Sequence, residues 1–349
     1  MFSEQLASDE FARARTLARL APHLSPADQP RAWQAARDLH DAGARARALC
    51  SLTSMLPVDR RGAILAKALT VARSIDQPWL RVRALLPVLA RLPTVEKLPV
   101  AAEALDTIQL IPHEWHRGRA LMLVAHSLPD QIKDRAVAAA QAIETTYVRA
   151  LALSAYSANL SDALRVEVLR VAPLVQDDWL RASLLTSVAG DLNSEQRADT
   201  LAEARRISDR AARVSALHGM ARTLPEHARS RVLQEALVVA RSIEEKSSRA
   251  ETLTALLDDL PDDQQVLVRE EARQAARSIE EAALRAAVLI DLLVADDNAP
   301  DLLREVQATL AAIEDVDSRA ETLSQLIPYR VVEERAAAAR AVLDLWRSG

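Results

Sequence analysis

The sequence predicts an all-α protein built from repeated pairs of helices, and three observations predict this fold class. First, the pattern Arg-(small)-x-x-Leu occurs ten times in 349 residues, and successive arginines lie 32 to 36 residues apart, a spacing typical of repeat proteins. Second, Ala, Leu, Arg and Glu dominate, all of them good helix formers, whereas the chain has only six glycines. Third, the residue seven places after each of these arginines is apolar, so each helix carries one apolar stripe. We call the ten arginines the anchors: Arg13, Arg45, Arg81, Arg117, Arg149, Arg181, Arg213, Arg249, Arg285 and Arg319.

Each repeat is predicted to contain two helices joined by a short turn. In the unit that starts at Arg213, one apolar stripe predicts the first helix: Leu217, Met220, Ala221 and Leu224. Pro225 ends that helix, because proline cannot continue the hydrogen-bond pattern. A second stripe predicts the second helix: Val232, Leu233, Ala236, Leu237, Ala240 and Ile243. A polar turn, residues 244–248, then leads to the next anchor, Arg249.

The same order repeats along the chain. Most turns between the two helices carry a proline: Pro57, Pro93, Pro129, Pro225, Pro261 and Pro328. A lone pair of helices cannot bury two apolar stripes, whereas stacked pairs can. No Gly/Ser-rich linker interrupts the repeats, so we expect residues 1–349 to form a single α-solenoid domain. Phe2 and Phe11 are expected to cap the first layer, and Trp346 the last.

The repeat pattern resembles a known class of arrays. The elements Arg-Ala-x-x-Leu, Leu-Pro and Ala-Arg-x-Ile-Glu/Asp resemble tetratricopeptide-like (TPR-like) and HEAT-like α-solenoids of bacterial signalling and defence proteins. The Trp, Leu-Gly and Tyr pattern of the first tetratricopeptide helix is absent. The resemblance implies a right-handed α-solenoid of about ten two-helix repeats that binds a protein partner and has no chemistry or cofactor of its own.

The sequence also bears on the compartment in which the protein is expected. The N-terminus has acidic residues and no apolar core of a signal peptide, and no apolar run approaches the ~20 residues that span a membrane. The single cysteine, Cys50, excludes an internal disulfide and is expected to be a buried small hydrophobe. These features predict a cytoplasmic protein without a membrane partner.

Charge is unevenly distributed along the chain. Residues 1–140 carry 19 Lys and Arg against 14 Asp and Glu, a net charge of +5. Residues 141–349 carry 25 against 35, a net charge of −10. The two parts therefore present different electrostatic fields to partners.

The anchors are predicted to be structural. An acid stands four residues before seven of them: Asp9, Asp41, Asp177, Asp209, Glu245, Glu281 and Asp315. Such an acid suits the positive end of a helix dipole and can pair with the anchor on the same helix face. We therefore expect a ladder of ion pairs between layers.

A second arginine series is a candidate binding surface. It stands two residues after the first four anchors: Arg15, Arg47, Arg83 and Arg119. Later units lose it, with Leu151, Ser183, Ser215, Glu251, Ala287 and Glu321 at that position. The row is either a solvated face or a groove for an acidic peptide, an acidic protein surface or a phosphate-bearing ligand.

An aromatic series overlaps the arginine row. It stands two residues before four adjacent anchors: Trp79, Trp115, Tyr147 and Trp179. These rings either fill the junction between helices or anchor a partner, since Trp, Tyr and Arg dominate binding hot spots.

The predicted function is that of a non-enzymatic scaffold or adaptor that docks a protein or peptide partner. The alternative is a sensor that binds a nucleotide or nucleic acid on the basic N-terminal half. His113 and His116 have a spacing used in metal sites, but no third ligand is evident in the sequence. An enzymatic site would need residues that the sequence does not group together.

Overall fold

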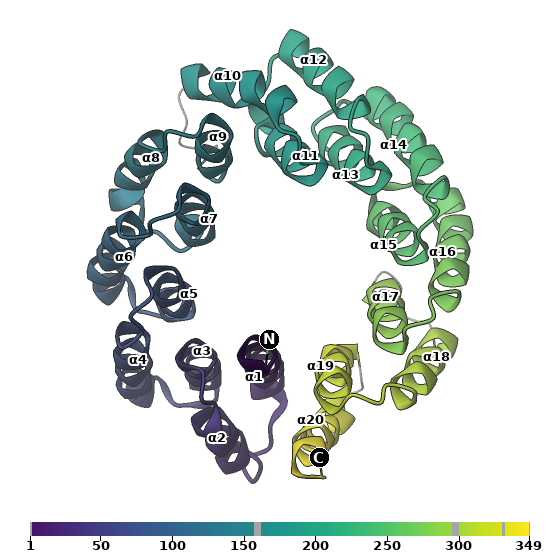
Figure 1. The fold of residues 1–349 in the computed structure, drawn as a ribbon. Helices are drawn as coiled ribbons and strands as arrows, with labels where there is room; N and C mark the ends of the chain where they lie inside the picture. The colour runs from purple at the N-terminus through teal and green to yellow at the C-terminus, as the bar shows by residue number, and fades with distance from the viewer. Residues whose placement is uncertain (1, 157–161, 295–299, 330–331, 349) are drawn as a thin grey trace. The chain divides into compact units, whose positions relative to one another are not determined.

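The computed structural model describes the chain apart from residues 1, 157–161, 295–299, 330–331 and 349. For residues 2–8, 162–164, 191, 329, 332–333 and 347–348 it describes the backbone alone. The described part consists of twenty α-helices with short 3-10 turns and contains no β-strand, so the predicted all-α class is confirmed (Figure 1). None of its helices is both long and apolar enough to cross a membrane.

The helices divide into two compact units. Unit 1 contains residues 1–139 and 310–349, so it is formed by both ends of the chain, and unit 2 contains residues 140–309. The helices of unit 1 are α1 (Phe2–Leu20), α2 (Gln29–Asp38), α3 (Ala42–Leu52), α4 (Val58–Arg73), α5 (Pro78–Leu89), α6 (Thr94–Gln109), α7 (Glu114–Ala125), α8 (Lys133–Gln141), α19 (Val316–Leu326) and α20 (Val332–Ser348). Those of unit 2 are α9 (Thr146–Ser154), α10 (Asp162–Val171), α11 (Asp178–Ser187), α12 (Ser194–Arg205), α13 (Arg210–Ala221), α14 (Glu226–Arg241), α15 (Lys246–Leu256), α16 (Asp262–Arg277), α17 (Ala282–Val294) and α18 (Pro300–Ala311).

Odd-numbered helices carry the anchors. Each of the ten anchors lies on one odd-numbered helix, from Arg13 on α1 to Arg319 on α19. Within unit 1, α1, α3, α5 and α7 form one row, and α2, α4 and α6 form a second row beside it (Figure 1). The leucine four residues after the anchor is buried in nine of the ten cases, and Leu323 on α19 is half-buried. The apolar stripes are thus buried between neighbouring helices, as the periodicity predicts.

The anchors hold the joint between consecutive helices. Eight of them donate a hydrogen bond to the carbonyl oxygen of the residue six positions earlier. That residue is aliphatic and lies just after the end of the preceding helix. In the Arg213 repeat, Nε of Arg213 lies 2.6 Å from the carbonyl oxygen of Ile207. Because the last carbonyls of a helix have no partner within it, a guanidinium there satisfies an acceptor that would otherwise be lost. These eight anchors therefore have the structural role that the sequence predicts, but they fulfil it through this hydrogen bond to a carbonyl oxygen.

The acids before the anchors have a different role from the expected ladder. Five of them accept a hydrogen bond from backbone N–H groups in the first turn of the next helix: Asp41, Asp177, Asp209, Glu245 and Asp315. They are helix N-caps, which typically stabilise a helix by about 1 kcal/mol. Ion pairs between layers occur on even-numbered helices, as between Arg73 and Glu103 or Arg241 and Glu271, and between α1 and α19, where Arg13 pairs with Asp317.

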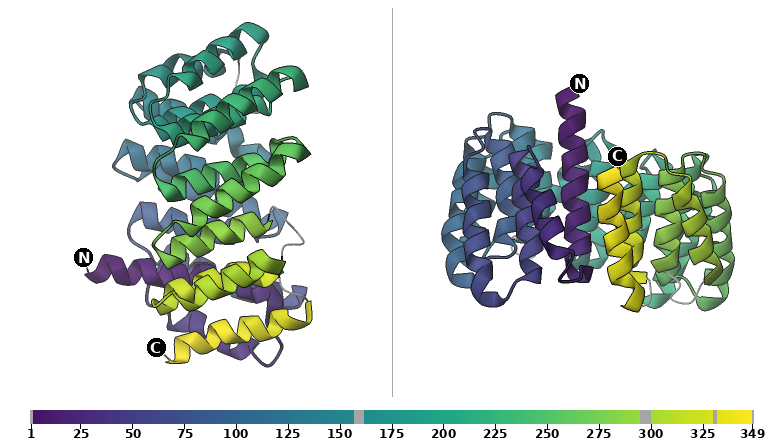
Figure 2. Two further views of the ribbon diagram at one scale, coloured as in Figure 1. Left: turned by 90° about the vertical axis from the view of Figure 1, so that its right-hand side faces the viewer. Right: turned by 90° about the horizontal axis from the view of Figure 1, so that it is seen from below.

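The first and last helices are neighbours within unit 1. Helix α1 packs between α3 and α19, and Figure 2 shows α1 beside α19 and α20. Asp28, just before α2, accepts hydrogen bonds from Arg340 of α20. Phe11 and Trp346 therefore do not cap free ends, because α19 and α20 cover the side of α1 that the repeat pattern leaves open. The side chain of Phe2 lies outside the described residues.

Candidate functional site

The predicted arginine row lies entirely in unit 1. Arg15, Arg47, Arg83 and Arg119 lie on the successive odd-numbered helices α1, α3, α5 and α7. Equal offsets from the anchors place these side chains at equivalent points of neighbouring helices. The structure thus brings the four predicted arginines onto one row.

Arg15 forms an ion pair with an acid on α19. It donates two hydrogen bonds to the carboxylate of Glu321 on α19, at 2.9 Å and 3.2 Å, and Arg19 lies 3.4 Å from the same carboxylate. Glu321 occupies the same repeat position on α19 as Arg15 does on α1. The first member of the row is therefore neutralised within the protein.

The remaining three arginines have no acidic partner among the described residues. Arg47 and Arg83 are half-buried, and Arg119 is exposed. Burial lowers the pKa of Arg47, and the positive charges of Arg83, Arg15 and Arg91 lower it further. Positive charge therefore accumulates on α3 and α5 without an acidic partner for Arg47 or Arg83 among the described residues.

Aromatic rings hold the guanidinium of Arg83. Its central carbon lies 5.0 Å from the ring centre of Phe11 and 5.9 Å from that of Trp79, both within cation–π range. Phe11 belongs to α1 and Arg83 to α5, so the ring reaches over the intervening helix α3 at Gly43. A Cβ atom at Gly43 would lie 3.1 Å from Cζ of Phe11, so glycine leaves the room that this ring needs.

The sequence predicted Phe11 only as a cap of the first layer, and not its contact with Arg83. It stands two residues before the anchor Arg13, which is the offset of the aromatic series. Gly43 interrupts that series on α3, and the interruption concealed the connection between Phe11 and Trp79. In the sequence, the only indication of this contact is that Phe11 stands two residues before its anchor, as the other members of the aromatic series do.

Trp79 and Trp115 lie on the same row of helices, at the starts of α5 and α7. Both side chains are half-buried, and the Trp79 ring lies 5.2 Å from the ring of His116 at an angle of 32°. The ring of His113 in turn meets that of His116 edge-on at 5.8 Å. The histidine pair is thus part of an aromatic cluster, and the described residues include no group of three His, Cys, Asp or Glu side chains placed to hold a metal ion.

Tyr147 and Trp179 belong to unit 2. Their side chains are 41% and 54% exposed, at the starts of α9 and α11. The candidate site is therefore restricted to unit 1. We define the arginine face as Arg47, Arg83, Arg119, Trp79 and Trp115.

Cys50 does not contribute a reactive thiol to this face. It is fully buried on α3, as the sequence predicts, and burial raises the pKa of the thiol to about 12. The thiol is therefore protonated at neutral pH and acts as a small packing group.

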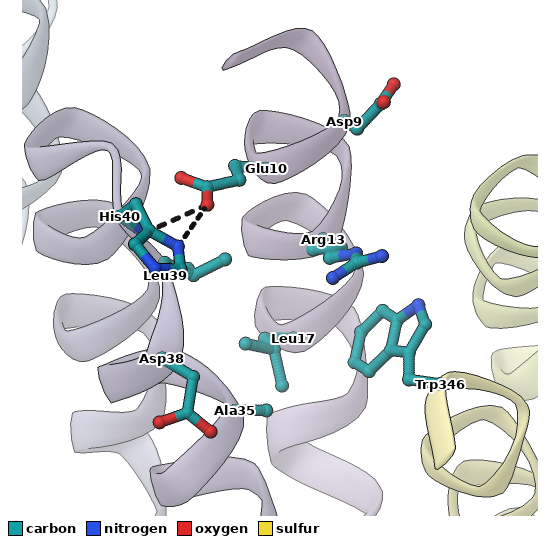
Figure 3. A pocket seen from close by; sticks show the side chains of 9 residues that line it. All are labelled: Asp9, Glu10, Arg13, Leu17, Ala35, Asp38, Leu39, His40 and Trp346. Atoms are coloured by element: carbon teal, nitrogen blue, oxygen red, sulfur yellow. Dashed lines mark hydrogen bonds and ion pairs between the residues drawn. The ribbon is translucent and has the colours of Figure 1, made fainter. Parts of the chain in front are cut away.

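A cavity of about 420 Å³ lies on another part of unit 1 (Figure 3). Side chains of α1, of the end of α2 and of α20 line it: Asp9, Glu10, Arg13, Leu17, Ala35, Asp38, Leu39, His40 and Trp346. Glu10 is only 7% exposed and accepts hydrogen bonds from the backbone N–H groups of His40 and Asp41, while the His40 ring lies 3.2 Å from it. None of these residues belongs to the arginine face.

Neither a protein-family model nor a curated protein matches this chain. Its function is therefore inferred from its own residues and their geometry.

Proposed function

We propose that the chain is a right-handed α-solenoid of about ten two-helix repeats, and that it is a non-enzymatic scaffold that docks an acidic protein or peptide on the arginine face. The repeated architecture is supported by the ten anchors on ten odd-numbered helices. The sequence resemblance supports a place in a cytoplasmic bacterial signalling or antiphage defence complex.

The uncompensated charge of Arg47, Arg83 and Arg119 is the observation that carries this proposal. Several other arginines of unit 1 are paired with acids, as Arg15 with Glu321 and Arg73 with Glu103 show. Holding the half-buried guanidinium of Arg47 among other arginines without an acid costs stability. A partner that supplies carboxylates recovers this cost when it binds.

Binding would combine steering and anchoring. The arginines attract an acidic partner over a distance and increase the rate of encounter. Trp79, Trp115 and the ring-held guanidinium of Arg83 offer preorganised contact area, so little side-chain entropy is lost on docking. The site needs no cofactor for this role.

A nucleotide or nucleic acid is the second candidate. The observation that favours it is Arg83 between two aromatic rings, since bases stack on such surfaces while arginines hold phosphates. Salt separates the two: nucleic-acid binding weakens steeply with ionic strength, whereas an interface anchored by tryptophan depends less on it.

The test uses fluorescence anisotropy with three labelled probes: a helical peptide rich in Glu and Leu, the same peptide with Lys in place of Glu, and a single-stranded DNA oligonucleotide. We expect the protein to bind the Glu peptide and not the Lys peptide. The triple variant Arg47→Gln, Arg83→Gln, Arg119→Gln should bind about tenfold more weakly, since each exposed charge contact contributes about 0.5 kcal/mol.

The matched control is the double variant Arg37→Gln, Arg60→Gln. These arginines are exposed on α2 and α4, outside the arginine face, and have no acidic partner among the described side chains. Their loss should leave binding unchanged. Equal binding of the Glu and Lys peptides, or of wild type and triple variant, would disprove the proposal, and tight, steeply salt-dependent binding of DNA would replace it by the second candidate.

A further inference from the structure

Arg13 has a different role from the eight anchors that bond a carbonyl oxygen. In eight repeats the anchor guanidinium donates a hydrogen bond to the carbonyl oxygen of the residue six positions earlier. Before Arg13 the helix is continuous from Phe2, so that carbonyl lies inside α1, where helical hydrogen bonds use it. The Arg13 side chain is instead bound by Asp317 and borders the cavity of Figure 3.

The cavity combines an apolar floor with an acidic rim. Leu17 and Leu39 are buried beneath it, and the indole of Trp346 reaches over from α20 toward Leu17 (Figure 3). Its volume of about 420 Å³ lies within the range of small-molecule sites. An apolar floor of this kind suits a hydrocarbon chain.

Negative charge dominates the rim. Asp9, Glu10 and Asp38 line the cavity, and its one arginine, Arg13, is bound by a fourth carboxylate, that of Asp317. Burial raises the pKa of Glu10, but the hydrogen bonds from Asp41 and His40 outweigh it and hold that pKa below its ordinary value. Glu10 is therefore ionised at neutral pH.

Asp38 stands where a helix disfavours it. It is the last residue of α2, at the negative end of the helix dipole, and it accepts a hydrogen bond from the side-chain amide of Gln34 at 2.7 Å. Asp9 makes no hydrogen bond with a cationic side chain among the described residues, although its charge acts on Arg13, which Asp317 binds. Neither Asp9 nor Asp38 is thus hydrogen-bonded to a cation of the protein, and both can attract a cation from outside.

Trp346 adds an aromatic wall. Its indole N–H donates to Oδ1 of Asp317 at 2.9 Å, and this bond fixes the ring beside Arg13. Trp gives the strongest cation–π attraction among the aromatic side chains. An acid-rimmed, apolar-floored cavity with a tryptophan wall is complementary to a positive group on an apolar stem.

We propose that this cavity binds an organic cation, an alkylammonium or guanidinium group carried on a hydrocarbon stem. A bare metal ion fits less well, because it would gain nothing from the apolar floor or the indole. An anion is disfavoured by the carboxylates of the rim. The same chemistry is present in a free diamine and in a basic side chain of a partner.

The test is ¹⁹F NMR of protein labelled with 5-fluorotryptophan, which gives one signal for each of the five tryptophans. The Trp346→Phe variant identifies the relevant signal. Titration with 1,5-diaminopentane should shift this signal and leave those of Trp33, Trp79, Trp115 and Trp179 in place. A short peptide with one central lysine is the second arm: tighter binding of the diamine indicates a free amine, and tighter binding of the peptide indicates a partner side chain.

Charge variants make the test specific. Asp9→Asn, Asp38→Asn should weaken binding at least fivefold without loss of helical signal, because Asp38 is unfavourable for α2. The control Asp59→Asn, Glu96→Gln removes two exposed acids from α4 and α6 and should bind as wild type does. Binding unchanged in the first variant, no shift of the Trp346 signal, or preference for 1,5-pentanedioate over the diamine would overturn the proposal. The arginine-face variant should bind the diamine normally, so the outcome is independent of the proposed function.

Discussion

Arg13 donates two hydrogen bonds to Asp317, at 2.9 Å and 3.1 Å, although 304 positions separate the two residues in sequence. The pair joins the first anchor helix to the last one within unit 1. The Arg13 side chain is 46% exposed and that of Asp317 16%, so solvent screens the pair in part. Similar pairs join Arg15 to Glu321 and Arg31 to Asp344.

We predict that salt loosens this junction. Because these pairs are partly exposed, raising NaCl to about 1 M shortens the screening length to about 3 Å and weakens them. Amide hydrogen exchange of α1 should accelerate in high salt more than that of α13, which lies inside unit 2. A double-mutant cycle of Arg13→Ala and Asp317→Ala should give a coupling of about 0.5–1 kcal/mol in low salt; no measurable coupling would contradict this assignment.

Replacing an anchor that bonds a carbonyl oxygen should lower the free energy of unfolding. Arg213→Met removes the hydrogen bond to the Ile207 carbonyl and leaves that oxygen without its donor, so the free energy of unfolding should fall by about 1–3 kcal/mol in urea titrations. Arg13→Met removes no carbonyl bond and should cost less. Equal losses in the two variants would show that the carbonyl bond is not what the anchor contributes.

Two helix glycines should respond to alanine in opposite directions. A Cβ atom at Gly62 on α4 meets nothing within 4 Å, so Gly62→Ala should stabilise by about 0.5–1 kcal/mol through backbone entropy. At Gly219 on α13 it would overlap Cγ2 of Thr186 and lie 3.0 Å from its Cβ, so Gly219→Ala should destabilise. Thermal unfolding measures both, and Thr186→Ala should recover part of the second loss by removing the overlapping methyl group.

Removal of Arg47 should stabilise the protein. Its charge is half-buried beside other arginines and has no acid partner among the described residues, so Arg47→Met relieves repulsion and desolvation together. We expect a gain of about 0.5 kcal/mol in the free energy of unfolding. Arg60→Met, at an exposed position of α4, should change it little. A loss of stability in Arg47→Met would mean that this side chain is structural, and would weaken its assignment to a binding surface.

Glu10 should make stability depend on pH. Its pKa is lowered on folding, because the bonds from His40 and Asp41 outweigh burial, so its contribution is fully present above its ordinary pKa of 4.5. That contribution is lost as pH falls through the lower folded-state pKa. Wild type should therefore be more stable than Glu10→Gln at pH 7, and the difference should shrink below pH 4.5. A difference that is constant down to pH 2 would contradict this assignment.

Local periodicity predicted the helices and the buried leucines, because each repeat uses the same short-range spacing. It could not predict the contact of Arg15 with Glu321, since that depends on small rotations between layers that add up along the chain. The expected acid–anchor ladder was wrong for a local reason: a carboxylate before a helix finds backbone N–H groups closer than the next arginine. The contact of Phe11 with Arg83 was not predicted, because Gly43 interrupts the aromatic series between Phe11 and Trp79. The same glycine leaves the space that the Phe11 ring occupies.

Unit 1 has a consequence for synthesis on the ribosome. Residues 1–139 emerge before unit 2 is translated, whereas residues 310–349 emerge after it. At about 5–20 residues per second, the nascent helix α1 waits on the order of 15–60 s for α19, which begins about 300 residues later. During that interval the uncovered side of α1 is accessible to chaperones, and termination of synthesis before α19 would leave it uncovered permanently.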